Sequence, residues 1–212
     1  MVEMAPMKDT ETFLKVLDPE DSSTGGGSAA AISGAMAGAL VAMVCWLCAK
    51  APETEDGEAF RRSALEGRQL SERLLAGSRE DAQAFQALRG AFKLPKGSEE
   101  EQKKRSQAIQ SAWIEAARIP LENAARCWQA LQLGSQLSGR VLPQVRSDLN
   151  CAILLARAGL LGCLENVDIN LPSIQDQTIV SELAGQADWL RAALKGLEQT
   201  LDKRSTPRSS GK

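Results

Sequence analysis

Apolar side chains recur along most of the chain at the spacing of three to four residues that is typical of amphipathic α-helices. This periodicity predicts helices over residues 9–17, 25–49, 57–89, 98–137, 147–165 and 176–203. Breaker-rich segments separate these helices, and no stretch alternates with a period of two over a useful length. The expected fold is therefore all-α: a single-domain antiparallel bundle of five to six helices over residues 8–203, followed by a disordered polar tail over residues 204–212.

Local signals predict how several helices begin and end. Ser98 and Glu101 fit a capping box at the start of the fourth helix, and Pro120 predicts a kink or a restart within it. Ser147 and Asp148 stand where the fifth helix begins, and capping of that helix is the simpler interpretation of both.

The predicted helix 25–49 carries no charged residue and is long enough for a membrane span. Two observations favour the core of a soluble protein instead. Much of the segment is Ala, Gly and Ser, which gain little from lipid, and the sequence before it is acidic rather than basic. We therefore expect a buried, Ala/Gly-rich central helix that packs backbone-close against its neighbours or a second subunit, in a cytoplasmic protein without membrane contact.

Composition narrows the possible chemistry. The net charge of -2 provides no electrostatic surface for nucleic acid. Histidine is absent, which excludes Ser-His-Asp and Cys-His nucleophile systems and His-ligated metals. The odd number of cysteines, five, favours reduced thiols. Cys45 and Cys48 form a C-x-x-C pattern inside an apolar helix without a second pair, so we expect packed core thiols and no metal site.

A glycine-rich turn before the uncharged helix is the first candidate ligand site. It comprises Ser23, Thr24, Gly25, Gly26, Gly27 and Ser28. A helix start offers unpaired N–H groups and the positive end of the helix dipole, and glycine allows close approach to the backbone. No Gly-Lys-Ser/Thr follows and no strand precedes the turn, so neither a phosphate-binding loop nor a dinucleotide fold is supported. A flexible helix cap is an equally weighted alternative.

Asp81 is the second candidate. It lies among small and apolar residues of a predicted helix, where an inward carboxylate is costly unless it has a partner or a function. A solvated position on the helix surface is the simpler interpretation, and the residues alone leave both open.

Taken in order, these segments resemble the methenyltetrahydrofolate cyclohydrolase and formiminotetrahydrofolate cyclodeaminase family. The resemblance rests on the glycine-rich stretch 24–44, the D-x-x-A-F/Y motif at 81–85, Leu94-Pro95-Lys96, Ile119-Pro120-Leu121, Ser147-Asp148, and the N-V-x-[IV]-N motif at 166–170. It extends from about Thr12 to Leu201, and the ordered set is more specific than any single motif.

The resemblance implies an α-helical homodimer with folate clefts near the subunit interface. It implies one of two reactions: hydrolysis of a 5,10-methenyl bridge to a 10-formyl group, or cyclisation of a formimino group with loss of ammonia. Both pass through a tetrahedral carbon beside a delocalised cation, and a carboxylate can stabilise that cation and carry a proton.

Within that resemblance, Asp81 is the expected catalytic carboxylate. Asp148 is the second expected catalytic residue and, with Ser147, would grip the pterin or hold the water. The glycine-rich turn would meet the ligand through its N–H groups. The expected substrate is a tetrahydrofolate derivative, with no tightly bound cofactor.

Two segments depart from the family pattern. Residues 46–56 are acidic where the family is Lys-rich, and lysines there would suit the glutamate carboxylates of folate. Residues 139–146 lack the family's asparagines, and we expect Arg140 and Arg146 to replace some carboxylate contacts. Three interpretations therefore stay open: a folate cyclohydrolase or cyclodeaminase, an enzyme of the same fold with a changed and possibly non-folate substrate, and a non-catalytic dimeric binding or regulatory homologue.

Overall fold

The computed structural model describes residues 8–51 and 56–205, and in this part of the chain the elements are helices, with no strand. They are α1 (Lys8–Leu17), α2 (Gly26–Lys50), α3 (Gly57–Phe92), α4 (Glu99–Leu137), η1 (Pro143–Val145), α5 (Arg146–Asn170), η2 (Leu171–Ser173) and α6 (Gln177–Ser205). The predicted all-α fold is confirmed, and its helices are in the predicted order. Residues 206–212 of the expected polar tail lie outside the described residues.

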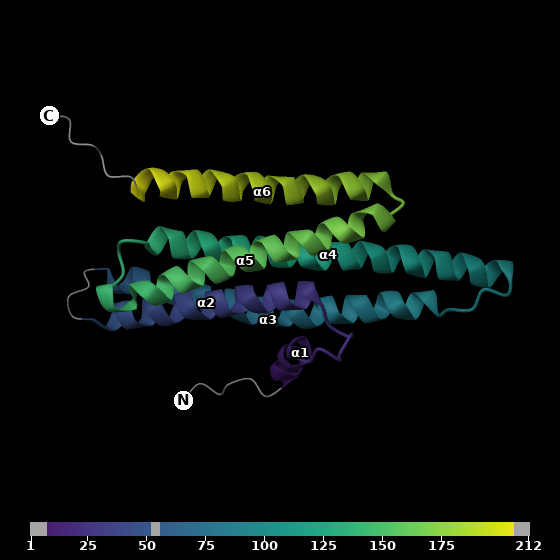
Figure 1. Ribbon diagram of the computed structural model, residues 1–212, viewed down its shortest axis with the longest axis horizontal. Coiled ribbons are helices and arrows are strands. Elements are labelled where there is room, and N and C mark those ends of the chain that lie inside the picture. Colours follow the sequence, from purple (N-terminus) through teal and green to yellow (C-terminus); the bar gives the residue numbers. More distant parts are fainter. Residues whose placement is uncertain (1–7, 52–55, 206–212) are drawn as a thin grey trace.

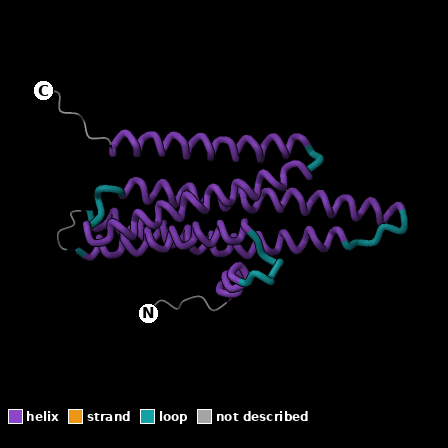
Figure 2. The backbone as a smooth tube through the Cα atoms, viewed as in Figure 1, coloured by secondary structure: helices purple, strands orange, loops and turns teal. Residues whose placement is uncertain are grey.

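The five long helices run roughly along the long axis of the molecule, and the short helix α1 crosses them at one side (Figure 1). Helix α2 packs mainly against α3 and α5, and α4 packs against α3 and α5. Helix α6 forms the outer edge and touches chiefly α4. The connections lie at the ends of the bundle, and α3 and α4 extend past the start of α2 (Figure 2). The start of α2 is therefore flanked by longer neighbours.

Helix α2 is the buried central helix that its composition predicts. A Cβ atom on Gly38 would lie 2.8 Å from the carbonyl oxygen of Gly67 on α3, and one on Gly159 of α5 would lie 2.8 Å from that of Ala30. Small residues thus let two helices approach the α2 backbone closely. Gly26–Lys50 and Pro143–Ser173 are long and apolar enough to cross a membrane by length and composition, but 61% of the α2 window is buried inside the fold.

The buried cysteines pack as core side chains. Cys45 and Cys48 are fully buried, and burial, with Cys48 nearby, raises the pKa of Cys45 to about 12. Cys45 is therefore a thiol at neutral pH, and both side chains are packed in the core, as the sequence predicts. Cys127 and Cys163 are also fully buried.

One predicted helix end is confirmed by the structure, and two others differ from it. The Ser98–Glu101 capping box is present. Ser147 and Asp148 do not cap α5, because the helix already starts at Arg146 and Val145 holds the cap position without a side-chain bond. The segment 166–172, expected to end this helix, instead continues it through Asn170.

Pro120 neither ends nor restarts α4, which runs unbroken from Glu99 to Leu137. Proline has no N–H, so the carbonyl of Ala116, four residues earlier, loses its helical donor. The side-chain amide of Asn170 on α5 takes that place, since its Nδ2 lies 2.7 Å from the Ala116 oxygen. A hydrogen bond from a neighbouring helix thus compensates for the proline.

Candidate functional site

The start of α2 and the middle of α3 meet at Asp81. The Ser28 hydroxyl donates a hydrogen bond to Asp81 Oδ2 at 2.9 Å. A Cβ atom on Gly27 would lie 2.7 Å from the same oxygen and closer still to Oδ1, so only glycine leaves room for the carboxylate here. The group at this helix start is therefore a carboxylate of the protein itself, placed against the positive end of the helix dipole.

The electrostatic environment of Asp81 suits proton transfer. Burial raises the pKa of Asp81 above its ordinary value, while the hydroxyl and the backbone N–H of Ser28 act in the opposite direction. Desolvation thus moves this carboxylate toward the pH range in which it can both accept and donate a proton. The solvated interpretation of Asp81 is not what the structure shows.

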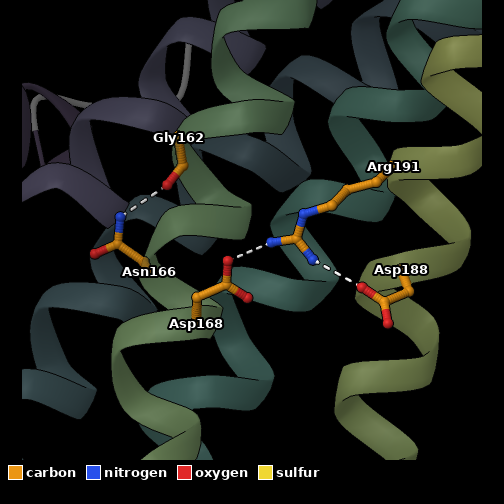
Figure 3. Close-up of polar contacts among 5 residues, drawn as sticks. All are labelled: Gly162, Asn166, Asp168, Asp188 and Arg191. Carbon is orange, nitrogen blue, oxygen red and sulfur yellow. Dashed lines mark hydrogen bonds and ion pairs between the residues drawn. The ribbon is translucent and has the colours of Figure 1, made fainter.

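The end of α5 brings two asparagine side chains close to the start of α2. Asn166 stands over Gly26, where a Cβ atom would lie 3.4 Å from its Nδ2, and it donates to the Gly162 carbonyl of its own helix at 2.8 Å (Figure 3). Asn170, one turn further on, donates to the backbone oxygen of Asn166 at 2.8 Å as well as to Ala116. Both side chains are held in place by backbone carbonyls.

These groups surround a cavity of about 390 Å³. Its lining consists of Ser22, Thr24, Gly25, Gly27, Asp81, Ala82, Phe85, Leu88, Trp113, Ala116, Asn166, Ile169 and Asn170. Flat apolar walls with a few convergent polar groups are typical of a small-molecule site. Among the described lining residues the only charged side chain is Asp81, and none is Lys or Arg.

The structure brings most of the glycine-rich turn to this cavity. Thr24, Gly25 and Gly27 line it, Gly26 contacts Asn166, and Ser28 holds Asp81. Ser23 is not among the lining residues, and its N–H bonds to Asp21 Oδ1 at 2.6 Å. Gly25 caps α2 with extended backbone and has nothing within 4 Å of a Cβ atom, so it faces open space.

The other predicted residues lie at or just before the start of α5, whereas the cavity amides lie at its end. Asp148 and Asn166 are on one continuous helix, and eighteen residues at 1.5 Å each separate them by about 27 Å. Ser147 and Arg146 are exposed beside Asp148. The geometry does not bring these residues to Asp81 within one chain, and their roles stay predictions.

Arg140 lies shortly before the start of α5 and contacts two residues of this chain. Its Nη2 lies 2.8 Å from Asp56 Oδ2, and its guanidinium stands over the Phe60 ring at 5.9 Å. Two residues after Arg140, the backbone N–H of Leu142 donates a hydrogen bond to Cys48 Sγ near the end of α2. Residues 52–55 of the divergent acidic segment lie outside the described residues.

Helix α6 is tied to α5 directly behind the cavity. Arg191 of α6 bonds to Asp168 of α5 and, at 3.3 Å, to Asp188 of its own helix (Figure 3). Asp168 points toward α6, whereas Asn166 points to the other side of α5. This partly exposed ion pair joins α6 to the helix segment that carries both cavity amides.

A larger cavity of about 700 Å³ lies between α4 and α6. Its lining includes Arg118, Glu122 and Trp189. Arg118 pairs with Glu115, and Glu122 pairs with Arg126, so these charges are matched within α4. We place the candidate site at Asp81, because burial raises the pKa of this carboxylate and Ser28 holds it at the wall of its cavity.

Sequence reasoning found the turn and Asp81 but gave no role to Asn166, Asn170, Phe85 or Trp113. The N-V-x-[IV]-N motif contained the needed information, because two asparagines four residues apart share one helix face. Their contact with the carbonyl that Pro120 leaves unpaired depends on how α4 and α5 lie side by side, which periodicity does not specify.

Residues 9–188 match the family described as Formiminotransferase-cyclodeaminase. The chain is 35% identical over 199 residues to a methenyltetrahydrofolate cyclohydrolase from Methylorubrum extorquens, covering 93% of this chain and 96% of that protein. It is 32% identical over 180 residues to a formimidoyltransferase-cyclodeaminase from Sus scrofa, covering 83% of this chain and 33% of that longer protein.

A solved structure shows the same fold. The crystal structure of a formiminotetrahydrofolate cyclodeaminase from Thermotoga maritima matches with a TM-score of 0.77 at 25% sequence identity, covering 96% of each chain. The likeness therefore extends over nearly the whole chain in both sequence and structure.

Proposed function

The chain belongs to the formiminotransferase-cyclodeaminase family of one-carbon tetrahydrofolate enzymes, and we propose that it hydrolyses 5,10-methenyltetrahydrofolate to 10-formyltetrahydrofolate. One structural observation carries the proposal: a desolvated carboxylate, Asp81, is held by Ser28 and Gly27 at the wall of a ligand-sized cavity. The full-length match to the Methylorubrum cyclohydrolase supports hydrolysis over the alternatives.

The proposed reaction assigns Asp81 two proton transfers. A water oxygen attacks the cationic bridge carbon while the Asp81 carboxylate accepts the proton that the water releases. Asp81 then gives this proton to N5 as the bond between N5 and the carbon breaks. The new hydroxyl loses its proton to solvent as the formyl C=O forms, so the overall reaction consumes one water and releases one proton. A pKa raised by burial fits a group that must both take and return a proton.

Cyclisation of a formimino group is the second candidate, and the Thermotoga cyclodeaminase structure supports it. In that reaction N10 would attack the formimino carbon, and Asp81 would protonate the amino group on the resulting tetrahedral carbon so that the C–N bond breaks and ammonia leaves. Both reactions need one proton carrier beside a tetrahedral carbon, so Asp81 serves either of them.

We also propose that a second copy of the chain covers an apolar face of α2. Met36, Met43 and Leu47 are exposed and spaced by seven and four residues, so they share one side of the helix. Leu154 of the adjacent helix α5 is 67% exposed. Such side chains favour association. Ser147, Asp148, Arg140 and Arg146 would act on a substrate beside Asp81 only if a second copy supplied them. A cytoplasmic location is part of this proposal.

Two substrates test the reaction. Purified protein is mixed with 5,10-methenyltetrahydrofolate, and loss of the methenyl absorbance is compared with an enzyme-free blank. The proposal expects decay faster than the blank and little ammonia release from a formimino substrate. Ammonia release without faster methenyl decay would support the cyclodeaminase, and an inert protein with both substrates would contradict the folate proposal.

A further inference from the structure

The orientation of the Asn170 amide is fixed by its neighbours. An asparagine NH₂ group has two hydrogens. Asn170 Nδ2 lies 2.7 Å from the Ala116 oxygen and 2.8 Å from the Asn166 oxygen, so both hydrogens are used. A flipped amide would set its oxygen against two carbonyl oxygens. What Asn170 presents to the cavity is therefore its Oδ1, an acceptor.

The fixed orientation originates in the sequence at Pro120. Without a proline there, the N–H of residue 120 would bond to the Ala116 carbonyl, and the Asn166 carbonyl would still hold the Asn170 amide. With Pro120 in place, the buried Ala116 carbonyl requires an outside donor. Pro120 on α4 thus directs the NH₂ group of Asn170 on α5 toward Ala116.

Two polar groups of the cavity wall are acceptors. Asp81 contributes a carboxylate and Asn170 contributes Oδ1, while no Lys or Arg is found among the described lining residues. Phe85 and Trp113 add flat apolar surface. A flat ring with N–H donors suits these groups, and a ligand carboxylate is disfavoured beside Asp81.

We propose that the pteridine end of the folate enters this cavity and that Asn170 Oδ1 accepts a hydrogen bond from the ring's N–H edge. The benzoylglutamate end then points out of the cavity. This inference rests on the proposed function and assigns Asn170 as a specificity-determining residue. The two halves of folate differ in the groups they carry: the pterin half has adjacent N–H donors, and the benzoylglutamate half has the carboxylates.

The test uses fragment binding rather than turnover. Calorimetry under anaerobic conditions measures how tightly tetrahydropterin and p-aminobenzoylglutamate each bind to the full chain. The comparison is between Pro120→Ala and the double variant Pro120→Ala/Asn170→Ala. In both, the residue 120 N–H can satisfy Ala116, so a loss at Asn170 reports on the ligand and not on the helix contact. A thermal melt verifies that both variants are folded.

We expect tetrahydropterin to bind about tenfold more weakly to the double variant, as loss of one good hydrogen bond predicts, with p-aminobenzoylglutamate binding unchanged. Equal tetrahydropterin affinity for the two variants would overturn the assignment, as would weaker binding of p-aminobenzoylglutamate instead, or no tetrahydropterin binding to Pro120→Ala. If tetrahydropterin binds as expected but the wild-type chain leaves methenyltetrahydrofolate intact, the proposed function fails while this assignment stands.

Discussion

The Ser28 hydroxyl of α2 donates a hydrogen bond to Asp81 of α3 at 2.9 Å, across the gap that Gly27 leaves open. Two residues separated by 53 positions in the sequence thus form the polar centre of the cavity. The pair joins the glycine-rich turn to the carboxylate.

Ser28→Ala should shift the pH profile of the reaction. The Ser28 side chain and backbone lower the pKa of Asp81 against the effect of burial. Removing the hydroxyl therefore raises that pKa, and the acid limb of kcat/KM should move to higher pH if the ionised carboxylate accepts the water proton. Ser33→Ala is the matched control, because Ser33 lies on the same helix and bonds only to the Leu155 carbonyl. An unmoved acid limb in Ser28→Ala would argue against Asp81 as the titrating group.

Gly27→Ala should displace Asp81 and reduce kcat by about 100-fold or more, since small misplacements of a reacting group have effects of that size. The added methyl would meet a carboxylate oxygen at 2.7 Å or less, and overpacking of this kind costs about 1–3 kcal/mol of stability. Gly90→Ala on α3 is the control, because its Cβ atom would meet nothing within 4 Å. It should keep activity and gain up to about 1 kcal/mol in unfolding free energy. Retained activity in Gly27→Ala would contradict the assigned geometry.

Asp81→Asn should stabilise the fold at neutral pH. Because burial raises the folded-state pKa of Asp81 above its ordinary value of 3.8, the protonated side chain favours folding. That contribution is complete below the unfolded-state pKa and is lost as the pH rises through the folded-state pKa. The variant, which does not titrate, should therefore exceed the wild type in melting temperature by a margin that grows above about pH 4 and then levels off. A margin that shrinks as the pH rises would show that the pKa is lowered instead.

Asn170→Ala should destabilise the protein by about 1–3 kcal/mol in the natural background, because it leaves the buried Ala116 carbonyl without a donor. The same change should cost much less in Pro120→Ala, where the restored helical N–H takes over. Chemical denaturation of the four proteins in this double-mutant cycle measures the difference. Additive effects would mean that Pro120 and Asn170 act independently.

The helices could be predicted from the sequence because apolar residues recur every three to four positions over long segments. The burial of α2 could be predicted because that segment is almost free of charged residues. Sequence reasoning named the glycine-rich turn and Asp81 as two separate candidates, and only the family resemblance gave Asp81 a catalytic role; that the two lie side by side comes from the structure. It could not show that Asp148 is about 27 Å from Asn166 along one continuous helix, since motif order carries no distance. Nor could it show that Arg140 pairs with Asp56, which depends on how the ends of α2, α3 and α5 meet.

The central claim is that the Asp81 carboxylate carries the proton in methenyl hydrolysis. Its most direct test is the single-turnover decay of the 5,10-methenyl absorbance in the wild type, Asp81→Asn and the surface control Glu66→Gln, an exposed residue of the same helix. We predict a loss of about 100-fold or more in Asp81→Asn, with the substrate still bound and Glu66→Gln unaffected. Decay at the wild-type rate in Asp81→Asn would contradict it.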